Sequence, residues 1–129
     1  KINKLKVKKT QEIIIHPYDF HCAKIADLEN QNLWQNGKEK EYQTEVSYIL
    51  RSILEHKFDI PVLEETTQNI MHLLKPFTLT NDLTQQIQST LNFADFVKYA
   101  KGKGMAHQHE KAMELLKNLV ELLKEKDAE

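Results

Sequence analysis

The clearest pattern in the chain is a stripe of apolar residues from Tyr42 to Phe58. Its members recur at steps of three and four, with two pairs of neighbours among them. This spacing keeps them on one face of a helix and excludes the alternation of a strand. The stripe consists of Tyr42, Val46, Ile49, Leu50, Ile53, Leu54 and Phe58. The pattern predicts an amphipathic helix over 38–57.

A helix is also predicted upstream, from Asp19 to about Gln35. Asp19 can accept hydrogen bonds from the free N–H groups at a helix N-terminus, or complement its positive end. Gly37 can adopt the positive φ that the end of a helix commonly needs. Cys22 is expected to act as a small buried hydrophobe of this helix. The predicted apolar side consists of Phe20, Cys22, Ala23, Ile25 and Leu28.

Three further helices are predicted from the threonines, prolines and glycines downstream. Thr66 or Thr67 is expected to cap a short helix, which Pro76 ends because proline cannot continue a helix. A longer helix that opens with a threonine is expected over 80–101. A last helix is expected over 105–126, where leucines again recur at helical spacing.

These elements predict an all-α, single-domain bundle of four to five helices with an extended basic N-terminal arm. The arm covers 1–16 and the bundle covers 17–129. Within the arm, Ile13, Ile14 and Ile15 favour a strand, but the sequence offers no second strand to pair with them. We therefore expect either an extended segment that lies on the bundle or a contact with another chain.

The net charge of −1 is unevenly distributed along the chain. Residues 1–9 hold five lysines and no acidic residue, whereas the remaining residues hold 13 basic and 19 acidic side chains. A basic arm fits a position beside an anionic membrane surface, where each lysine contributes about 1 kcal/mol of attraction. A solvated chain end explains the same pattern. The candidate membrane-proximal residues are Lys1, Lys4, Lys6, Lys8 and Lys9.

The chain lacks the residue patterns of most enzymes and metal sites. His109 and Glu110 begin like the zinc-protease motif, but Met113 occupies the position of the second histidine. The turn Gly102–Gly104 follows a helix, so it is predicted to be a linker and not a phosphate-binding loop. All six histidines are expected at the surface or half-buried. The sequence therefore predicts no catalysis, no metal and no cofactor.

Aromatic and basic residues alternate near the end of the helix expected over 80–101. Either the rings fill the core while the lysines stay solvated, or both kinds of side chain bind nucleic acid. The single Arg51 among 18 basic residues favours the first interpretation, because contacts to bases and phosphates favour arginine. The stretch consists of Phe93, Phe96, Lys98, Tyr99, Lys101 and Lys103.

Three segments carry a family resemblance: 33–42 (LWQNGKEKEY), 46–67 and 92–101 (NFADFVKYAK). In this order they resemble the cytoplasmic C-terminal domain of BatD-like membrane proteins, which belong to bacterial aerotolerance operons, mostly of Bacteroidetes. The resemblance implies no catalytic role. Two positions depart from the family pattern. Gln43 stands in place of a second aromatic residue, and 102–105 lacks the usual proline.

The resemblance also implies a location and partners. An anchor helix would precede the arm and place it on the cytoplasmic side of the bacterial inner membrane, in agreement with the positive-inside rule. A MoxR-type ATPase and a von Willebrand factor A protein accompany this family, and either is an implied partner of the domain.

Within the resembling segments, most of the shared residues are expected to be structural. Trp34 is expected to pin the turn at Gly37, and Arg51 to pair with Glu64 or Asp95. The same residues could instead build a docking surface. The candidate structural or docking residues are Trp34, Gly37, Lys40, Tyr42, Arg51, Glu64, Thr66, Thr67, Asp95 and Lys98.

The function predicted from these observations is a non-catalytic protein–protein interaction module of a membrane-anchored bacterial protein. One alternative is a cytosolic TPR-like helical adaptor, because Trp34, Gly37 and Tyr42 mimic part of a TPR hairpin. The other alternative is a helical nucleic-acid-binding domain. The sequence leaves the identity of the partner and the oligomeric state open.

Overall fold

The computed structural model describes residues 15–128, with side chains up to Lys124. The predicted membrane-proximal lysines and two of the three strand candidates, Ile13 and Ile14, lie outside the described residues. Ile15 is exposed at the edge of the domain.

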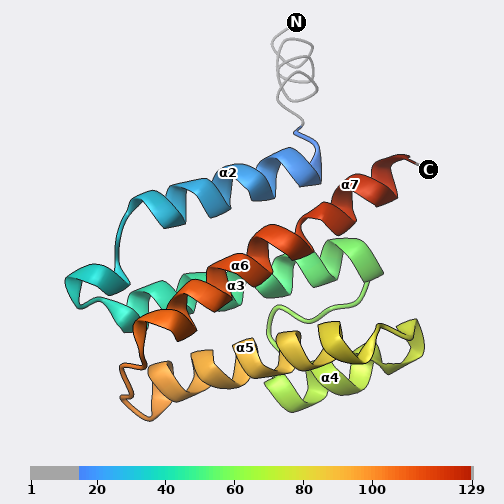
Figure 1. Ribbon diagram of the computed structural model, residues 1–129. Helices are drawn as coiled ribbons and strands as arrows, with labels where there is room; N and C mark the ends of the chain where they lie inside the picture. The colour runs from blue at the N-terminus through green and yellow to red at the C-terminus, as the bar shows by residue number, and fades with distance from the viewer. Residues whose placement is uncertain (1–14, 129) are drawn as a thin grey trace, which may run out of the picture.

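Every regular element of the described chain is helical, which confirms the predicted all-α bundle (Figure 1). The elements are α2 (Pro17–Asn30), the 3-10 turn η1 (Trp34–Asn36), α3 (Glu39–Phe58), α4 (Thr67–Leu74), the 3-10 turn η2 (Lys75–Phe77), α5 (Asn81–Tyr99), α6 (Ala106–Leu119) and α7 (Glu121–Ala128). The predicted last helix is present as α6 and α7, which follow one another with an interruption at Val120.

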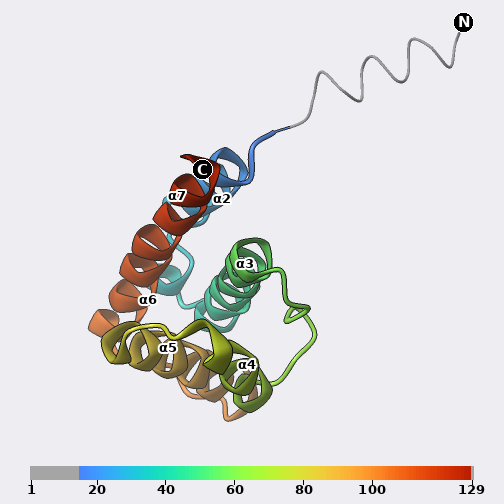
Figure 2. The same ribbon diagram turned by 90° about the vertical axis from the view of Figure 1, so that its right-hand side faces the viewer.

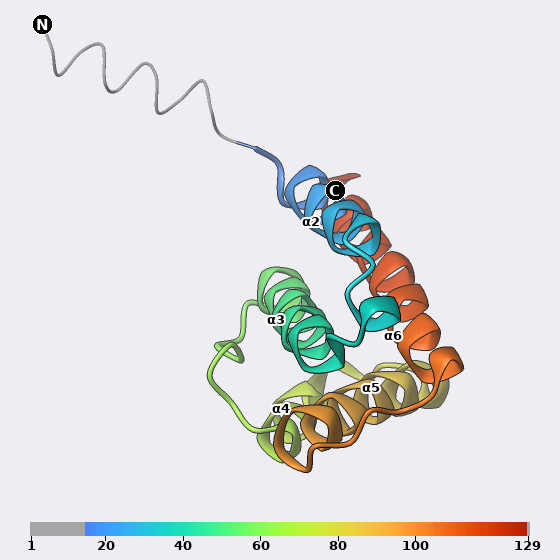
Figure 3. The ribbon, with the colours of Figure 1, turned by 90° about the vertical axis from the view of Figure 1, so that its left-hand side faces the viewer.

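Helix α3 is the central element of the bundle. The other helices form an arc around it, from α2 through α7, α6 and α5 to α4 (Figures 2 and 3). Contacts join α3 to α2, η1, α5, α6 and α7. The predicted stripe accounts for most of its buried residues, which are Tyr42, Gln43, Val46, Ser47, Ile49, Leu50, Ile53 and Leu54. This apolar stripe therefore forms the middle of the single core.

Helix α2 differs from its prediction at both ends. The His16 side chain caps it by accepting a hydrogen bond from the Tyr18 N–H at 3.0 Å. Asp19 lies in the first turn, where it complements the positive end of the helix. The helix ends at Asn30 and does not run to about Gln35, because Asn32 adopts a left-handed backbone with φ 52°.

The buried face of α2 also differs from the expected one. His21, Ile25 and Leu28 point into the core at steps of four and three, and Cys22 is half-buried beside them. Phe20 and Ala23, which were predicted on the apolar side, are exposed. They lie off the face of the helix that His21, Ile25 and Leu28 define. The prediction missed this face because it begins at a histidine, which an apolar pattern leaves out.

The predicted threonine caps of α4 and α5 are confirmed. Thr66 caps α4 by accepting from the Asn69 N–H at 3.1 Å. Thr80 caps α5 by accepting from the Leu83 N–H, also at 3.1 Å. Gly37 adopts the predicted positive φ, 81°, but it ends the 3-10 turn η1 and not the first helix, which already ends at Asn30. Threonine caps and a positive-φ glycine act within one turn of the backbone, so local sequence predicts them well.

The first and last helices of the described chain lie side by side and run in opposite directions (Figure 1). The Tyr18 hydroxyl donates to Glu121 at 3.3 Å near one end. Lys117 pairs with Glu29 at 2.8 Å further along. The turn between α5 and α6 lies at the other end of the domain (Figure 1). Within the described residues, no helix has the length and apolar character needed to cross a membrane.

Candidate functional site

A cluster around His109 joins η1, α3, α5 and α6 at the end that holds the α5–α6 turn. We call it the His109 box and define it as Trp34, Tyr42, Gln43, Phe93 and His109. The histidine ring is 1% exposed. It stacks on the Trp34 ring at a centroid distance of 5.3 Å, and its edge contacts are with Tyr42 at 5.6 Å and Phe93 at 5.2 Å.

Hydrogen bonds determine which nitrogen of His109 carries the proton. Nε2 lies 2.7 Å from the carbonyl oxygen of Lys103, which can only accept, so Nε2–H donates to it. Nδ1 then accepts from the amide nitrogen of Gln43 at 3.0 Å. The histidine therefore ties the turn after α5 to the central helix α3.

Two further polar groups complete the His109 box. The Tyr42 hydroxyl donates to the His109 backbone carbonyl at 3.0 Å. Burial raises the pKa of the Tyr42 phenol, and Glu29 and Glu110 raise it further, so the hydroxyl keeps its proton. The amide oxygen of Gln43 is buried, and no group in the described part of the chain hydrogen-bonds to it.

The candidate docking residues Trp34, Gly37, Lys40 and Tyr42 lie at this end. Trp34 is half-buried, and its ring stacks on His109 of α6. It therefore joins η1 to α6, in addition to the predicted role at the turn before Gly37. Tyr42 is buried in the core, and Lys40 is exposed on the first turn of α3. Gln43, one of the two departures from the BatD-like pattern, supplies a hydrogen bond to His109.

A second group of candidate residues lies where the loop after α3 meets α4 and α5. Arg51 donates to the Ser47 hydroxyl and, at 3.1 Å, to the Glu65 backbone carbonyl. The predicted pairing of Arg51 with the carboxylate of Glu64 or Asp95 is therefore wrong, although Arg51 does tie α3 to this loop.

Asp95 and Glu64 have other surroundings. Asp95 accepts from the hydroxyl of Thr67 at 2.7 Å and thereby joins α5 to α4. Glu64 and Thr66 are exposed, whereas Thr67 is buried. Lys98 is half-buried, with its ammonium nitrogen 5.2 Å from the centroid of the Tyr99 ring.

Two of the six histidines are fully buried, which corrects the expectation that all lie at the surface or half-buried. Besides His109, His21 lies in the interface between α2 and α3. Its Nδ1 is 2.9 Å from the Pro17 carbonyl oxygen and its Nε2 is 2.8 Å from the Ser52 hydroxyl. Burial lowers the pKa of His21 below the ordinary value, so the ring is neutral at pH 7.

The aromatic residues at the end of α5 do not fill the core as one interpretation expected. The Phe96 side chain is 49% exposed and Tyr99 is 76% exposed, whereas Phe93 is half-buried in the His109 box. We call the exposed end of α5 and the turn after it the aromatic–lysine tip. It consists of Phe96, Lys98, Tyr99, Lys101, Lys103 and Met105.

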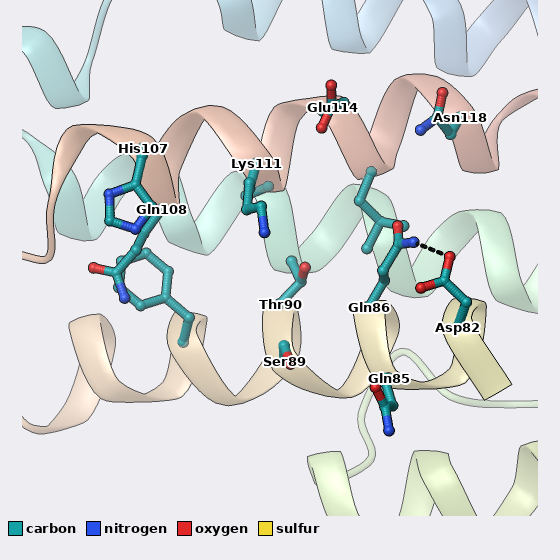
Figure 4. A pocket seen from close by; sticks show the side chains of 13 residues that line it. Asp82, Gln85, Gln86, Ser89, Thr90, His107, Gln108, Lys111, Glu114 and Asn118 are labelled. Carbon is teal, nitrogen blue, oxygen red and sulfur yellow. Dashed lines mark hydrogen bonds between the residues drawn. The ribbon is translucent and has the colours of Figure 1, made fainter.

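A polar groove of about 720 Å³ runs between α5 and α6 (Figure 4). Polar and charged side chains from both helices make up most of its lining. Asp82 accepts from Gln86 at 2.7 Å at one end of it. The groove can offer hydrogen bonds but little apolar surface, and ligand sites for small molecules are mostly apolar. It is a weaker candidate site than the tip for this reason.

Over the described part of the chain, no three histidine, cysteine or acidic side chains come together in an arrangement that could hold a metal ion. No protein-family model, curated protein or solved structure matches the chain.

Proposed function

We propose that this chain is a non-catalytic protein–protein interaction module of a membrane-anchored bacterial protein. The observation that supports this proposal is the aromatic–lysine tip, where Phe96 and Tyr99 near the end of α5 and Met105 just before α6 are each exposed. Large apolar side chains gathered at the surface are typical of interaction sites. Aromatic residues and methionine are also enriched in protein interfaces.

The partners follow from the resemblance to the BatD-like domain. Its implied partners are a MoxR-type ATPase and a von Willebrand factor A protein, bound at the cytoplasmic face of the inner membrane. The basic arm lies N-terminal to α2, and α2 begins at the end of the bundle opposite the α5–α6 turn (Figure 1). A membrane contact through the arm would therefore leave the tip free for a partner.

The test is a titration of the full-length parent protein, and of this domain, with each of the two partner proteins. We expect binding that Tyr99→Ala weakens by about tenfold, because exposed aromatic anchors carry much of the energy of an interface. Tyr48→Ala is the matched control, since Tyr48 is 51% exposed on α3 and outside the tip. Failure of both wild-type proteins to bind either partner would overturn this assignment.

Nucleic-acid binding is the second candidate, and the exposure of Phe96 and Tyr99 beside three lysines favours it. Exposed rings can stack on bases while lysines contact phosphates. The test is a titration with a labelled single-stranded oligonucleotide at several salt concentrations. Steeply salt-dependent binding that the double variant Lys98→Ala and Lys101→Ala reduces would support this candidate. Binding that the variant leaves unchanged would exclude the tip as the nucleic-acid surface.

A further inference from the structure

We propose that the aromatic–lysine tip binds an acidic protein segment that carries an apolar anchor residue. This inference rests on the proposed function, because it names the docking surface and the chemistry of the partner. Three independent observations support it: the charge of the tip, the exposure of its apolar side chains, and the contacts that hold its turn.

The charge of the tip is opposite to that of the rest of the bundle. Residues 96–109 contain three lysines and no aspartate or glutamate. The nearest carboxylates in sequence are Asp95 and Glu110. Asp95 accepts a hydrogen bond from Thr67, and Glu110 lines a groove that faces α2 and η1. The tip therefore presents positive charge that an acidic segment can complement.

The apolar part of the tip lies among these lysines. The Phe96 ring packs against Gly102, at a place where even a methyl group would collide with it. The ring thus lies beside the backbone between Lys101 and Lys103. Lys98 lies against the ring of Tyr99, and Met105 is 65% exposed at the start of α6. An apolar anchor side chain of a partner segment can contact these groups while the carboxylates of the same segment pair with the lysines.

The turn that carries the tip is held in one conformation. The His109 ring donates to the Lys103 carbonyl. The side chain of Gln108 accepts from the Met105 N–H at 2.8 Å. Gly104, with φ 75°, lies against the Phe93 ring of the His109 box. A surface ordered before binding loses less entropy when a partner docks, so these contacts favour recognition.

Two observations favour an acidic segment over nucleic acid or an anionic membrane. Outside residues 1–9 and 96–109, the chain has ten basic and 19 acidic side chains. This acidic remainder of the chain repels any part of an extended polyanion that reaches beyond the tip. The repulsion acts over about 10 Å at moderate salt. The tip also contains lysine but no arginine, the residue best suited to contacts with phosphates and bases. A short acidic segment avoids both disadvantages.

The experiment is a fluorescence-anisotropy titration of the full chain with a fluorescein-labelled peptide in which glutamates alternate with leucines. The test variant is Lys101→Glu with Lys103→Glu, and the second variant is Tyr99→Ala. We expect the double variant to weaken binding by about tenfold or more, and Tyr99→Ala by about threefold or more. These side chains are exposed, so the variants should keep the fold.

The control is Lys24→Glu with Lys75→Glu, which changes the net charge equally at two exposed lysines outside the tip. We expect this control to bind within about twofold of the wild type. Equal losses in the two double variants would overturn the inference, because general charge would then explain binding. Tighter binding of a thymidine oligonucleotide or of phosphatidylserine vesicles, with the same loss in the tip variant, would also overturn it.

The same variants separate this inference from the proposed function. If the wild type binds the peptide through the tip but neither partner protein binds, the proposed partners are wrong and the inference stands. If the partner proteins bind the wild type and the lysine variant equally well, the proposed function stands and the tip is not its docking surface.

Discussion

His109 takes the place of an apolar residue on the buried face of α6. It stands three and four positions before Ala112 and Met113, so it continues their side of the helix. This spacing is visible in the sequence and could have indicated burial. Its partner Gln43 lies 66 residues away, so no local pattern could have identified the hydrogen bond between them.

His109→Leu is expected to lower the free energy of unfolding by about 2–4 kcal/mol. The substitution removes two hydrogen bonds and the aromatic contacts of the ring, and it leaves the buried Gln43 amide without a partner. Urea denaturation followed by circular dichroism would measure the change. His107→Leu, at an exposed position two residues earlier, is the control and should change stability by less than about 0.5 kcal/mol. Equal effects at both positions would contradict the role given to His109.

At the scale of whole elements, the sequence predicts helices well where a local group decides their ends. The caps at Thr66 and Thr80 need only a side-chain oxygen within reach of the next turn. The end of α2 was missed because Asn32 adopts a left-handed backbone with φ 52°. Asparagine tolerates this conformation but does not require it, so the residue type alone did not reveal the break.

The two positive-φ glycines allow a test of how the turns are built. Gly37→Ala should cost about 1 kcal/mol of stability, because its only penalty is backbone strain at φ 81°, with open space around it. Gly104→Ala should cost about 2–4 kcal/mol, since its new methyl group would also collide with the Phe93 ring of the His109 box. Thermal denaturation of both variants would measure the difference. Similar losses would mean that Phe93 yields easily and that the α5–α6 turn is less firmly held than described.

At the scale of the whole molecule, the packing of α5 determines which of its large side chains are exposed. The buried residues of α5 are Ile87, Leu91, Ala94 and Val97, at steps of four, three and three. Phe96 and Tyr99 lie off this line and are therefore exposed despite their size. The sequence left both positions open, because an aromatic residue near an apolar stripe fits the core or the surface equally well. Only the position of α3 and α6 against α5 settles the choice.

The central position of α3 implies that the domain unfolds as one unit. Trp34, the only tryptophan, reports on the end with the His109 box, whereas far-ultraviolet circular dichroism reports on all helices. The two signals should give the same urea midpoint. Ile53→Ala, in the middle of the core, should lower both midpoints together and cost about 2–5 kcal/mol. Ile15→Ala, at an exposed isoleucine, is the control and should leave both unchanged. Separate midpoints would show that the two ends of the bundle unfold independently.

The antiparallel contact between α2 and the α6–α7 pair has a mechanical consequence. Tyr18 meets Glu121 near the outer ends of these helices, and Glu29 meets Lys117 further in. A tension applied between residue 15 and residue 128 would load the outermost contact first and then each inner contact in turn. The bundle would unzip at low force instead of resisting in shear. A tension applied between residue 15 and the α5–α6 turn would instead load the helices along their length and meet greater resistance.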